Sequence, residues 1–312
     1  MSDDRDLTKQ TILITGANGL VARRFAEKYS ETYALKFLTR KKSGQNEYEW
    51  NLETGYVDQK ALEGIDYLIH LAGANVGEKR WTEKRKQEII SSRVNASRLL
   101  LSKLKESGHS LKTFISASGV GYYGNFITEK VFTEEDNAGT DFLALLCRRW
   151  EEAAHEYSPI THRVLIFRCG VVLSDRGGAL PRLQMPIQYG LGANLGSGNS
   201  YLSWIHVDDL CKMIHFSIQH QDIKGIYNAV SPEIITMDKV NKNIARSMKR
   251  PFFLPNIPAC LVKLILGEMS SLLLTGNKVS AEKILSTGFT FDYPVIEQAL
   301  NSLSTSAAIW AR

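Results

Sequence analysis

The sequence has few of the residues that build disulfide-stabilised or metal-binding proteins. Its 312 residues include 4 cysteines and 7 histidines, and the histidines form no HExxH motif or similar cluster. No two cysteines have CxxC spacing; they are Cys147, Cys169, Cys211 and Cys260. We therefore expect free thiols in a reducing compartment and no bound metal.

Long apolar runs are also missing. The longest, residues 258–274, is interrupted by Lys263 and Glu268, whereas a membrane-spanning helix needs about 20 apolar residues. The first ten residues, MSDDRDLTKQ, are polar and acidic, so no signal peptide is expected. The sequence thus predicts a soluble, cytoplasmic protein without a membrane partner.

Charge of one sign is not concentrated in any segment. The chain has 38 Lys and Arg against 33 Asp and Glu, a net charge of +5, and its basic runs are interleaved with acids, as in residues 83–88. Nucleic-acid binding uses a basic stripe with interleaved aromatic residues, which this pattern does not provide. We expect solvated helix faces and no nucleic-acid partner.

Short apolar runs alternate with longer amphipathic ones through the first half of the chain. The apolar runs predict strands at 11–15, 35–39, 67–72, 113–117 and 164–167, and the amphipathic ones predict helices at 20–29, 83–105 and 142–157. Strands that are apolar throughout and alternate with helices are typical of a parallel sheet covered on both faces. The sequence predicts an α/β fold with a Rossmann-type, doubly wound parallel sheet.

The pattern changes after Gly170. Glycine- and proline-rich connections lead to Trp204 and to a helix with Asp208 as its expected N-cap, and three prolines cluster between residues 251 and 258. We expect a nucleotide-binding body over residues 8–250, with lobe segments from about residue 175. A small C-terminal domain over residues 251–305 would complete a smaller substrate lobe.

A glycine-rich segment, GANGLVA, joins the first predicted strand to the first predicted helix. Glycines there let the backbone approach a pyrophosphate, and the helix N-terminus offers unpaired N–H groups to it. Ala22 takes the place of the usual third glycine and is still small enough for packing. The context predicts a dinucleotide site, with a simple tight turn as the alternative. The residues expected to bind the cofactor are Gly16, Asn18, Gly19, Leu20 and Val21.

The residues that end the second predicted strand indicate which dinucleotide fits. An acidic residue there would bind the ribose 2′-hydroxyl of NAD. The chain instead has Thr39 and Arg40, followed by two lysines. Arginine forms charge-assisted, often bidentate bonds to a phosphate. The sequence predicts NADP(H), with a solvated surface turn as the alternative.

Further motifs extend over most of the chain. They are HLAGANV (70–76), SASGVGYYG (116–124), DFLALLCRRWEEAA (141–154), RCGVVL (168–173), SWIHVDDL (203–210) and LLTGNKV (273–279). Together with ITGANG they resemble the atypical extended short-chain dehydrogenases/reductases of the YfcH-like "epimerase family" group. The similarity runs from Ile12 to Leu303, and its last zone resembles that group's C-terminal domain of unknown function.

The resemblance implies further cofactor contacts. Leu71, Ala72 and Gly73 would line the nicotinamide ribose, Glu88 and Arg93 would reach the cofactor from the next helix, and Val172 would approach it from a later strand. The alternatives are ordinary structural roles for these residues. Leu71 and Ala72 could be strand core, and the two charged residues could lie on a helix surface.

The superfamily's catalytic Tyr-x-x-x-Lys pair is missing from the helix that should carry it. In that pair the lysine lowers the tyrosine pKa, so that the phenol exchanges a proton with substrate. Aligned on Glu151, the two positions hold Leu143 and Cys147. The one matching spacing, Tyr56 to Lys60, lies in the wrong part of the fold.

Ser118 and Tyr123 are the remaining catalytic candidates. Ser118 matches the superfamily's catalytic serine, and Tyr122 or Tyr123 could donate a proton. A tyrosine without a cation beside it keeps a pKa near 10, which is unfavourable at neutral pH. The alternative is that both tyrosines pack and stabilise the turn.

A substrate would bind beyond the carboxyl ends of the strands. Polar and aromatic candidates there are Asn75, Lys79, Arg80, Trp81, Trp204 and His206, with a structural role expected for the histidine. Their cations suit a phosphorylated or nucleotide-linked small molecule.

Two functions remain open at this point. One is an NADP(H)-dependent oxidoreductase or epimerase with a rearranged acid–base apparatus, and the other is a non-catalytic NADP(H)-binding redox sensor or regulatory scaffold. The substrate is unknown, and the oligomeric state is open. Many superfamily members form a homodimer through helices of the Rossmann body.

Overall fold

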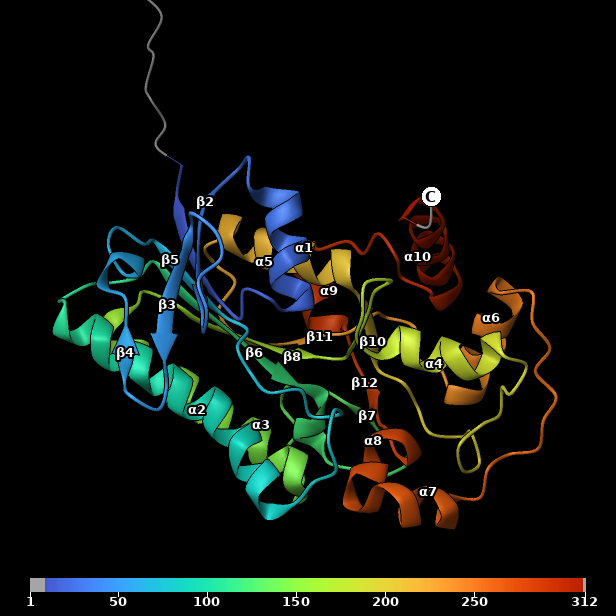
Figure 1. Cartoon of the computed structure of the whole chain (residues 1–312). Helices are drawn as coiled ribbons and strands as arrows, with labels where there is room; N and C mark the ends of the chain where they lie inside the picture. The colour runs from blue at the N-terminus through green and yellow to red at the C-terminus, as the bar shows by residue number, and fades with distance from the viewer. Residues whose placement is uncertain (1–8, 311–312) are drawn as a thin grey trace, which may run out of the picture.

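The computed structural model describes the backbone of residues 9–310 and the side chains as far as Leu303. Its centre is an eight-stranded sheet with the order β11-β8-β6-β5-β1-β2-β3-β4 (Figure 1). All neighbouring strands are parallel except β3 and β4. The strands are β1 (Thr11–Thr15), β2 (Ala34–Thr39), β3 (Glu47–Asn51), β4 (Tyr56–Val57), β5 (Tyr67–His70), β6 (Thr113–Gly119), β8 (Val164–Cys169) and β11 (Gly225–Ala229). The predicted doubly wound parallel sheet is confirmed.

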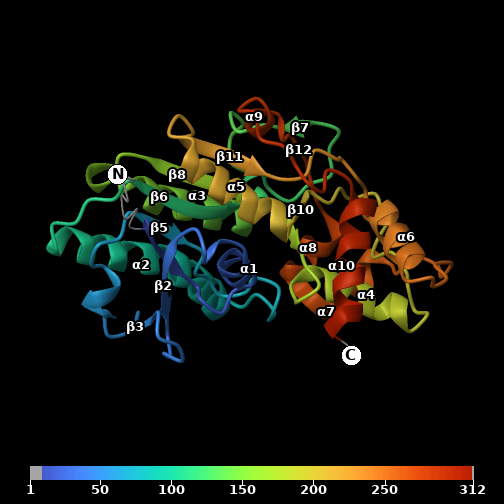
Figure 2. The same ribbon diagram turned by 90° about the horizontal axis from the view of Figure 1, so that it is seen from above.

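Helices cover both faces of this sheet. On one face lie α2 (Glu83–Glu106) and α3 (Phe142–His155), and on the other lie α1 (Leu20–Tyr29) and α5 (Val207–Gln219) (Figures 1 and 2). Successive residues of β1 explain the continuous apolar strands. Ile12 and Ile14 pack into the core beneath α1 and α5, whereas Leu13 packs into the core beneath α2 and α3. A strand buried on both faces cannot alternate between apolar and polar residues.

The predicted elements of the body agree closely with the structure, with two differences at their C-terminal ends. The strand predicted at 67–72 ends at His70. Leu71 and Ala72 leave the ladder because their backbone N–H groups donate to the Thr15 hydroxyl. The helix predicted at 142–157 ends at His155 and is followed by a short 3₁₀ helix, η3 (Ser158–Ile160).

A C-terminal lobe, formed by most of the chain from Val171 onward apart from α5 and β11, lies beside the carboxyl edge of the sheet (Figure 2). One of its cores joins Leu173 and Trp204 to Ile244 and Leu300. Its elements are β9 (Val171–Leu173), α4 (Ala179–Gln188), β10 (Trp204–His206), α6 (Met237–Ser247), α7 (Ala259–Leu266), η4 (Gly267–Ser270), α8 (Ser271–Leu274), β12 (Lys278–Val279), α9 (Glu282–Leu285) and α10 (Ile296–Trp310). The domain division predicted at residue 250 stays a prediction, because this core draws on segments from both sides of it.

Three short elements complete the described chain: β7 (Val131–Phe132), which pairs with β12, η1 (Gln59–Ala61) and η2 (Val120–Tyr123). Within the described residues, no helix is both long and apolar enough to cross a membrane.

A buried carboxylate holds the C-terminal segment against the body. Asp209 in α5 is fully buried, and its two oxygens accept the backbone N–H groups of Asp292 and Tyr293 at 2.7 and 3.0 Å. Burial is the main cause of the raised pKa of this carboxyl group. The bond joins segments more than eighty positions apart in the sequence.

We therefore predict that Asp209→Asn lowers the free energy of unfolding by about 1–3 kcal/mol, because the new amide would turn a donor toward a buried N–H group. Denaturant unfolding of the full chain measures this change. Asp292→Asn is the control, since that carboxylate is half exposed and pairs with Lys212 at the surface; its effect should stay within about 0.5 kcal/mol. Equal effects of the two substitutions would contradict the role assigned to Asp209.

Candidate functional site

The carboxyl ends of β1, β5, β6 and β8 meet at one edge of the sheet, and most of the predicted site residues follow these ends. The glycine-rich segment comes after β1. Gly16 has a φ of +76°, and a Cβ there would lie 3.2 Å from the backbone of Leu71 and Ala72. A side chain at this position would be strained and crowded, so the close approach of the two loops requires glycine.

Gly19 is the N-cap of α1, and no side chain caps this helix. Its own N–H donates to the Gly16 carbonyl at 2.7 Å, which closes the turn. The N–H groups of the first turn are therefore left for a ligand, and the helix dipole favours an anionic one. The Asn18 side chain stands beside this turn and accepts a hydrogen bond from Arg23.

A network of buried hydrogen bonds fixes the short segment that follows β5, residues 71–73, which we call the strip. Leu71 and Ala72 both donate their N–H groups to Thr15 Oγ1 at 3.0 Å, and the same oxygen lies 3.0 Å from His70 Nδ1. A hydroxyl has two acceptor positions and one proton, so the Thr15 proton goes to Nδ1. His70 Nε2 then carries the ring proton and donates it to the Arg93 carbonyl at 3.2 Å.

Burial lowers the pKa of His70 to about 4, so the ring is neutral at neutral pH. The histidine thus joins the ends of β1 and β5 to α2 without carrying a charge. Leu71, Ala72 and Gly73 are held beside the glycine-rich turn by this network. The structure therefore brings five of the predicted positions together: Gly16, Gly19, Leu71, Ala72 and Gly73.

Arg93 lies directly beneath Gly73. Its guanidinium carbon is 2.6 Å from the position that a Cβ of residue 73 would take, so a side chain there would have to displace Arg93. Arg93 Nη1 donates to the carbonyls of Ala74 and Ile89 at 3.0 Å, and the guanidinium stacks on Trp150 at 4.9 Å. The side chain is buried, contrary to the surface role that was the alternative reading of the sequence.

Glu88 and Val172 lie on two different elements, α2 and β9. Glu88 is half exposed and pairs at 2.8 Å with Arg85, whose guanidinium in turn donates to the Asn75 carbonyl. The hydrogen bond from Arg85 lowers the pKa of Glu88. The Val172 carbonyl and the Leu20 side chain both lie within 3.7 Å of a Cβ built on Gly178, so β9 stands close to the start of α1.

Val21 packs in the core between α1 and α5. Thr39 is buried at the end of β2, where its hydroxyl donates to the Lys41 carbonyl. Arg40 is exposed and makes no ion pair with any residue that the structure describes. The end of β2 therefore presents an unpaired cation and no carboxylate of its own.

The predicted catalytic hydroxyls are both buried and both donate within the protein. Ser118 donates to Glu151 at 2.7 Å, and Tyr123 donates to Asn228 at 2.7 Å. Arg168 binds both oxygens of Glu151 at 2.9 Å and also donates to the Tyr123 hydroxyl. Burial raises the pKa of Tyr123 to about 12. These contacts are the ones that a structural role predicts, and the catalytic roles stay predictions.

The face of α3 toward the site carries no acid or base in place of the missing pair. Leu143 lies against Gly121, and the Cys147 sulfur lies 3.6 Å from a Cβ built on Gly119. Burial raises the pKa of the Cys147 thiol to about 12. The thiol is therefore neutral at neutral pH and cannot replace a lysine.

Two aromatic residues expected near a substrate belong to the core instead. Trp81 is buried against Phe142 and donates its ring N–H to the Val76 carbonyl, and Trp204 is fully buried in the lobe. Arg80 packs against Gly267 of the lobe. These placements depend on how the lobe meets the body, which sequence patterns do not report.

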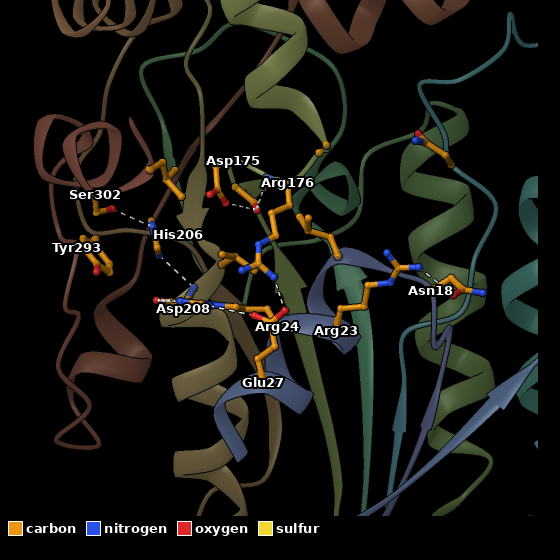
Figure 3. A pocket seen from close by; sticks show the side chains of 17 residues that line it. Asn18, Arg23, Arg24, Glu27, Asp175, Arg176, His206, Asp208, Tyr293 and Ser302 are labelled. Carbon is orange, nitrogen blue, oxygen red and sulfur yellow. Dashed lines mark hydrogen bonds and ion pairs between the residues drawn. The ribbon is translucent and has the colours of Figure 1, made fainter. Parts of the chain in front are cut away.

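A cavity of about 580 Å³ opens between the glycine-rich turn and the lobe (Figure 3). Asn18 and Arg23 line it from the body, and His206, Tyr293 and Ser302 line it from the opposite side. The cavity therefore adjoins the helix N-terminus at which an anion would bind.

The expected N-cap of α5 was wrong. His206 is the N-cap, and its Nδ1 accepts the Asp208 N–H at 3.1 Å. Asp208 lies in the first turn, where it binds Arg24 of α1 at 2.5 and 2.9 Å. Burial lowers the pKa of His206 to about 4, so the ring is a neutral acceptor in the structural role expected for it.

Residues 12–229 match the NAD dependent epimerase/dehydratase family, and residues 257–303 match a domain of unknown function, DUF1731. The epimerase family protein YfhF of Bacillus subtilis is 35% identical, with 94% of this chain and 97% of that protein covered. The epimerase family protein ML0860 of Mycobacterium leprae is 33% identical over 95% and 96% of the two chains.

Two solved structures are similar along nearly all of this chain. The human epimerase family protein SDR39U1, solved with NADPH, has a TM-score of 0.85 and 26% identity, covering 95% of this chain and 99% of that one. A nucleoside-diphosphate sugar epimerase from Corynebacterium glutamicum has a TM-score of 0.77 and 31% identity, and this chain spans 58% of its length. Because the family match covers well over half of the sequence, the chain belongs to the NAD dependent epimerase/dehydratase family and carries a C-terminal DUF1731 domain.

Proposed function

We propose that the protein binds NADP(H) and acts as a two-electron oxidoreductase on a small molecule. The observation that carries the proposal is the pairing of an uncapped α1 N-terminus with the unpaired Arg40 at the end of β2. The first suits a pyrophosphate and the second suits a 2′-phosphate. The human relative solved with NADPH supports the same choice of cofactor.

In this proposal, different residues contact different parts of the cofactor. Gly16, Asn18, Gly19, Leu20 and Val21 would hold the pyrophosphate, Thr39 and Arg40 the adenosine end, and Leu71, Ala72, Gly73, Glu88, Arg93 and Val172 the nicotinamide end. The bound nicotinamide supplies or accepts a hydride. The protein itself orients the ring through the strip that Thr15 and His70 fix.

A redox sensor without catalysis is the second candidate. The observation in its favour is that Leu143 and the neutral Cys147 stand where the acid–base pair would be. A sensor binds the cofactor tightly, turns nothing over, and has a protein partner whose affinity differs between NADP⁺ and NADPH. An epimerase acting on a nucleotide-linked sugar would instead need a base for the sugar hydroxyl.

We predict that Arg40→Glu weakens NADPH binding by at least about tenfold, because it replaces a charge-assisted contact with repulsion. NADH has no 2′-phosphate, so its affinity should change by less than about twofold. Fluorescence titration of the full chain with each nucleotide measures both constants.

Lys105→Glu is the matched control, since it makes the same change of net charge at an exposed position near the far end of α2. It should leave both affinities unchanged. Equal loss of NADPH and NADH affinity in Arg40→Glu, or no loss at all, would contradict the assignment of the 2′-phosphate site.

Ser118→Ala separates a catalytic hydroxyl from a structural one. A catalytic hydroxyl predicts loss of turnover at unchanged NADPH affinity. A hydroxyl that only holds Glu151 predicts a loss of about 1–2 kcal/mol in the free energy of unfolding with turnover kept. We expect the second result, because the Ser118 proton is directed to Glu151; steady-state kinetics and denaturant unfolding of the same variant decide between them.

A further inference from the structure

The nicotinamide end of the proposed site is short of proton donors. Among the described residues around Gly73 and Gly119, the Ser118 and Tyr123 hydroxyls donate to Glu151 and Asn228. Cys147 is a buried neutral thiol, and Leu143 occupies the position of the missing tyrosine. None of these four groups is placed to give a proton to a substrate.

Two buried N–H donors in the same region lack an acceptor. Arg93 Nε and Trp150 Nε1 have no hydrogen-bond partner among the described residues, although both side chains are more than 90% buried. They stack on each other, with the guanidinium 4.9 Å from the indole and directly against Gly73. Unmet donors in a buried place point to a ligand that supplies an acceptor atom.

The charge of Arg93 is also unbalanced. Its neighbour Arg85 pairs with Glu78 and Glu88, but no described carboxylate lies within ion-pair distance of Arg93. Burial lowers the pKa of Arg93 to about 10, which still leaves it protonated at neutral pH. An unpaired buried cation is costly, so a negative charge on a bound ligand would be strongly favoured there.

The surroundings of these donors are apolar. Trp81, Ile90 and Phe142 form a buried cluster between α2 and α3, and Leu272 of the lobe packs against it. A flat, apolar molecule with one electron-rich edge matches this combination of surfaces. A sugar nucleotide, with its many hydroxyl groups, does not.

We propose that the substrate is a planar conjugated acceptor, a quinone or an isoalloxazine. Its hydride adduct is a delocalised anion that the positive charge of Arg93 stabilises. This inference rests on the proposed function. The C4–H bond of NADPH breaks, and its electron pair forms a new O–H bond on a quinone oxygen or a new N–H bond at N5 of an isoalloxazine. NADPH is oxidised to NADP⁺ and the acceptor is reduced to its anion. Water then protonates that anion after the hydride step.

This chemistry needs no acid from the protein. Reducing an ordinary aldehyde or ketone would create an alkoxide, a far stronger base that must be protonated as it forms. A hydroquinone or reduced-flavin anion spreads its charge over the ring system. A fixed cation nearby is then sufficient to stabilise it.

The first test follows NADPH oxidation by the full-length protein with menadione, FMN, an aliphatic aldehyde and UDP-glucose. We expect turnover of menadione or of FMN, and the compound that is reduced identifies the acceptor as a quinone or a flavin. We expect no turnover of the aldehyde or of UDP-glucose. Turnover of the aldehyde or UDP-glucose at a comparable rate would overturn the proposal. Tight NADPH binding with no turnover of any acceptor would also overturn it, whereas absent NADPH binding would mean that the proposed function itself fails.

The second test uses isotopes to ask where the proton comes from. We expect a primary isotope effect when the transferred hydrogen at C4 of NADPH is deuterium, and no solvent deuterium effect on kcat. We also expect kcat to be independent of pH through the neutral range. A large solvent effect or a bell-shaped pH profile would show a protein acid at work and overturn the proposal.

Variants of Arg93 test the charge. Arg93→Gln should lower kcat by at least about tenfold, as expected for losing a contact with a charged group, and Arg93→Lys should restore part of it. Arg98→Gln, in the same helix but exposed and paired with Glu156, is the control and should keep kcat.

A readout independent of turnover is the binding of 2-hydroxynaphthoate, a flat and redox-inert anion, measured by calorimetry. Arg93→Gln should weaken it at least about tenfold, while Arg98→Gln should leave it unchanged. Unchanged binding and kcat in a folded Arg93→Gln protein would overturn the role of the cation. If Arg93→Gln does not fold, Arg93→Lys carries the test, since binding retained in Arg93→Lys supports the charge and binding lost there contradicts it.

Discussion

The Thr15 hydroxyl is the point on which the geometry of the site depends. It accepts two backbone N–H groups from the strip after β5 and gives its own proton to His70. Every bonding position of the oxygen is used, so the strip has one place in which all of these groups are satisfied. A serine could make the same bonds, but a valine would leave two buried N–H groups without an acceptor.

The helix that carries the catalytic pair in related enzymes has a different task in this chain. Glu151 of α3 receives hydrogen bonds from Ser118 of β6 and Arg168 of β8, and all three side chains are nearly fully buried. The carboxylate is balanced by the guanidinium that binds it, so the cost of burying both charges is partly offset. The polar groups that end these strands therefore fix α3 to the sheet.

Local signals in the sequence were sufficient for the body of the fold. The apolar runs and amphipathic stretches predicted five of the eight strands of the central sheet and the helices that cover it, with α1 found at its predicted bounds; β3, β4 and β11 were missed. The glycine-rich turn was found because its requirement is local: a tight turn, a close approach and a helix start. Arg40 could be proposed as a phosphate-binding residue from its position directly after a predicted strand.

Contacts between distant segments could not be predicted in this way. Arg24 and Asp208 are 184 positions apart, and nothing in either segment indicates the other. Asp208 looked like a cap because an acidic residue before a helix usually is one. The imidazole of His206, two residues earlier in the chain, took that role, and the Asp208 carboxylate binds Arg24 instead. Trp81 and Trp204 were placed near a substrate because tryptophans often line clefts, but the lobe buries both.

Gly73 and Arg93 have to be understood as a pair. The guanidinium occupies the space in which a side chain at residue 73 would begin, so a larger residue there would have to displace the arginine. A shorter residue at position 93 would remove this restriction. It would also remove the unpaired charge beneath the strip, which is the only one there among the described residues. Arg93 thus places a cation under the proposed nicotinamide site and also restricts what can stand at residue 73 above it. In the proposed site, the missing acid–base pair on α3 and the buried Arg93 charge on α2 together favour stabilising an anion over moving a proton.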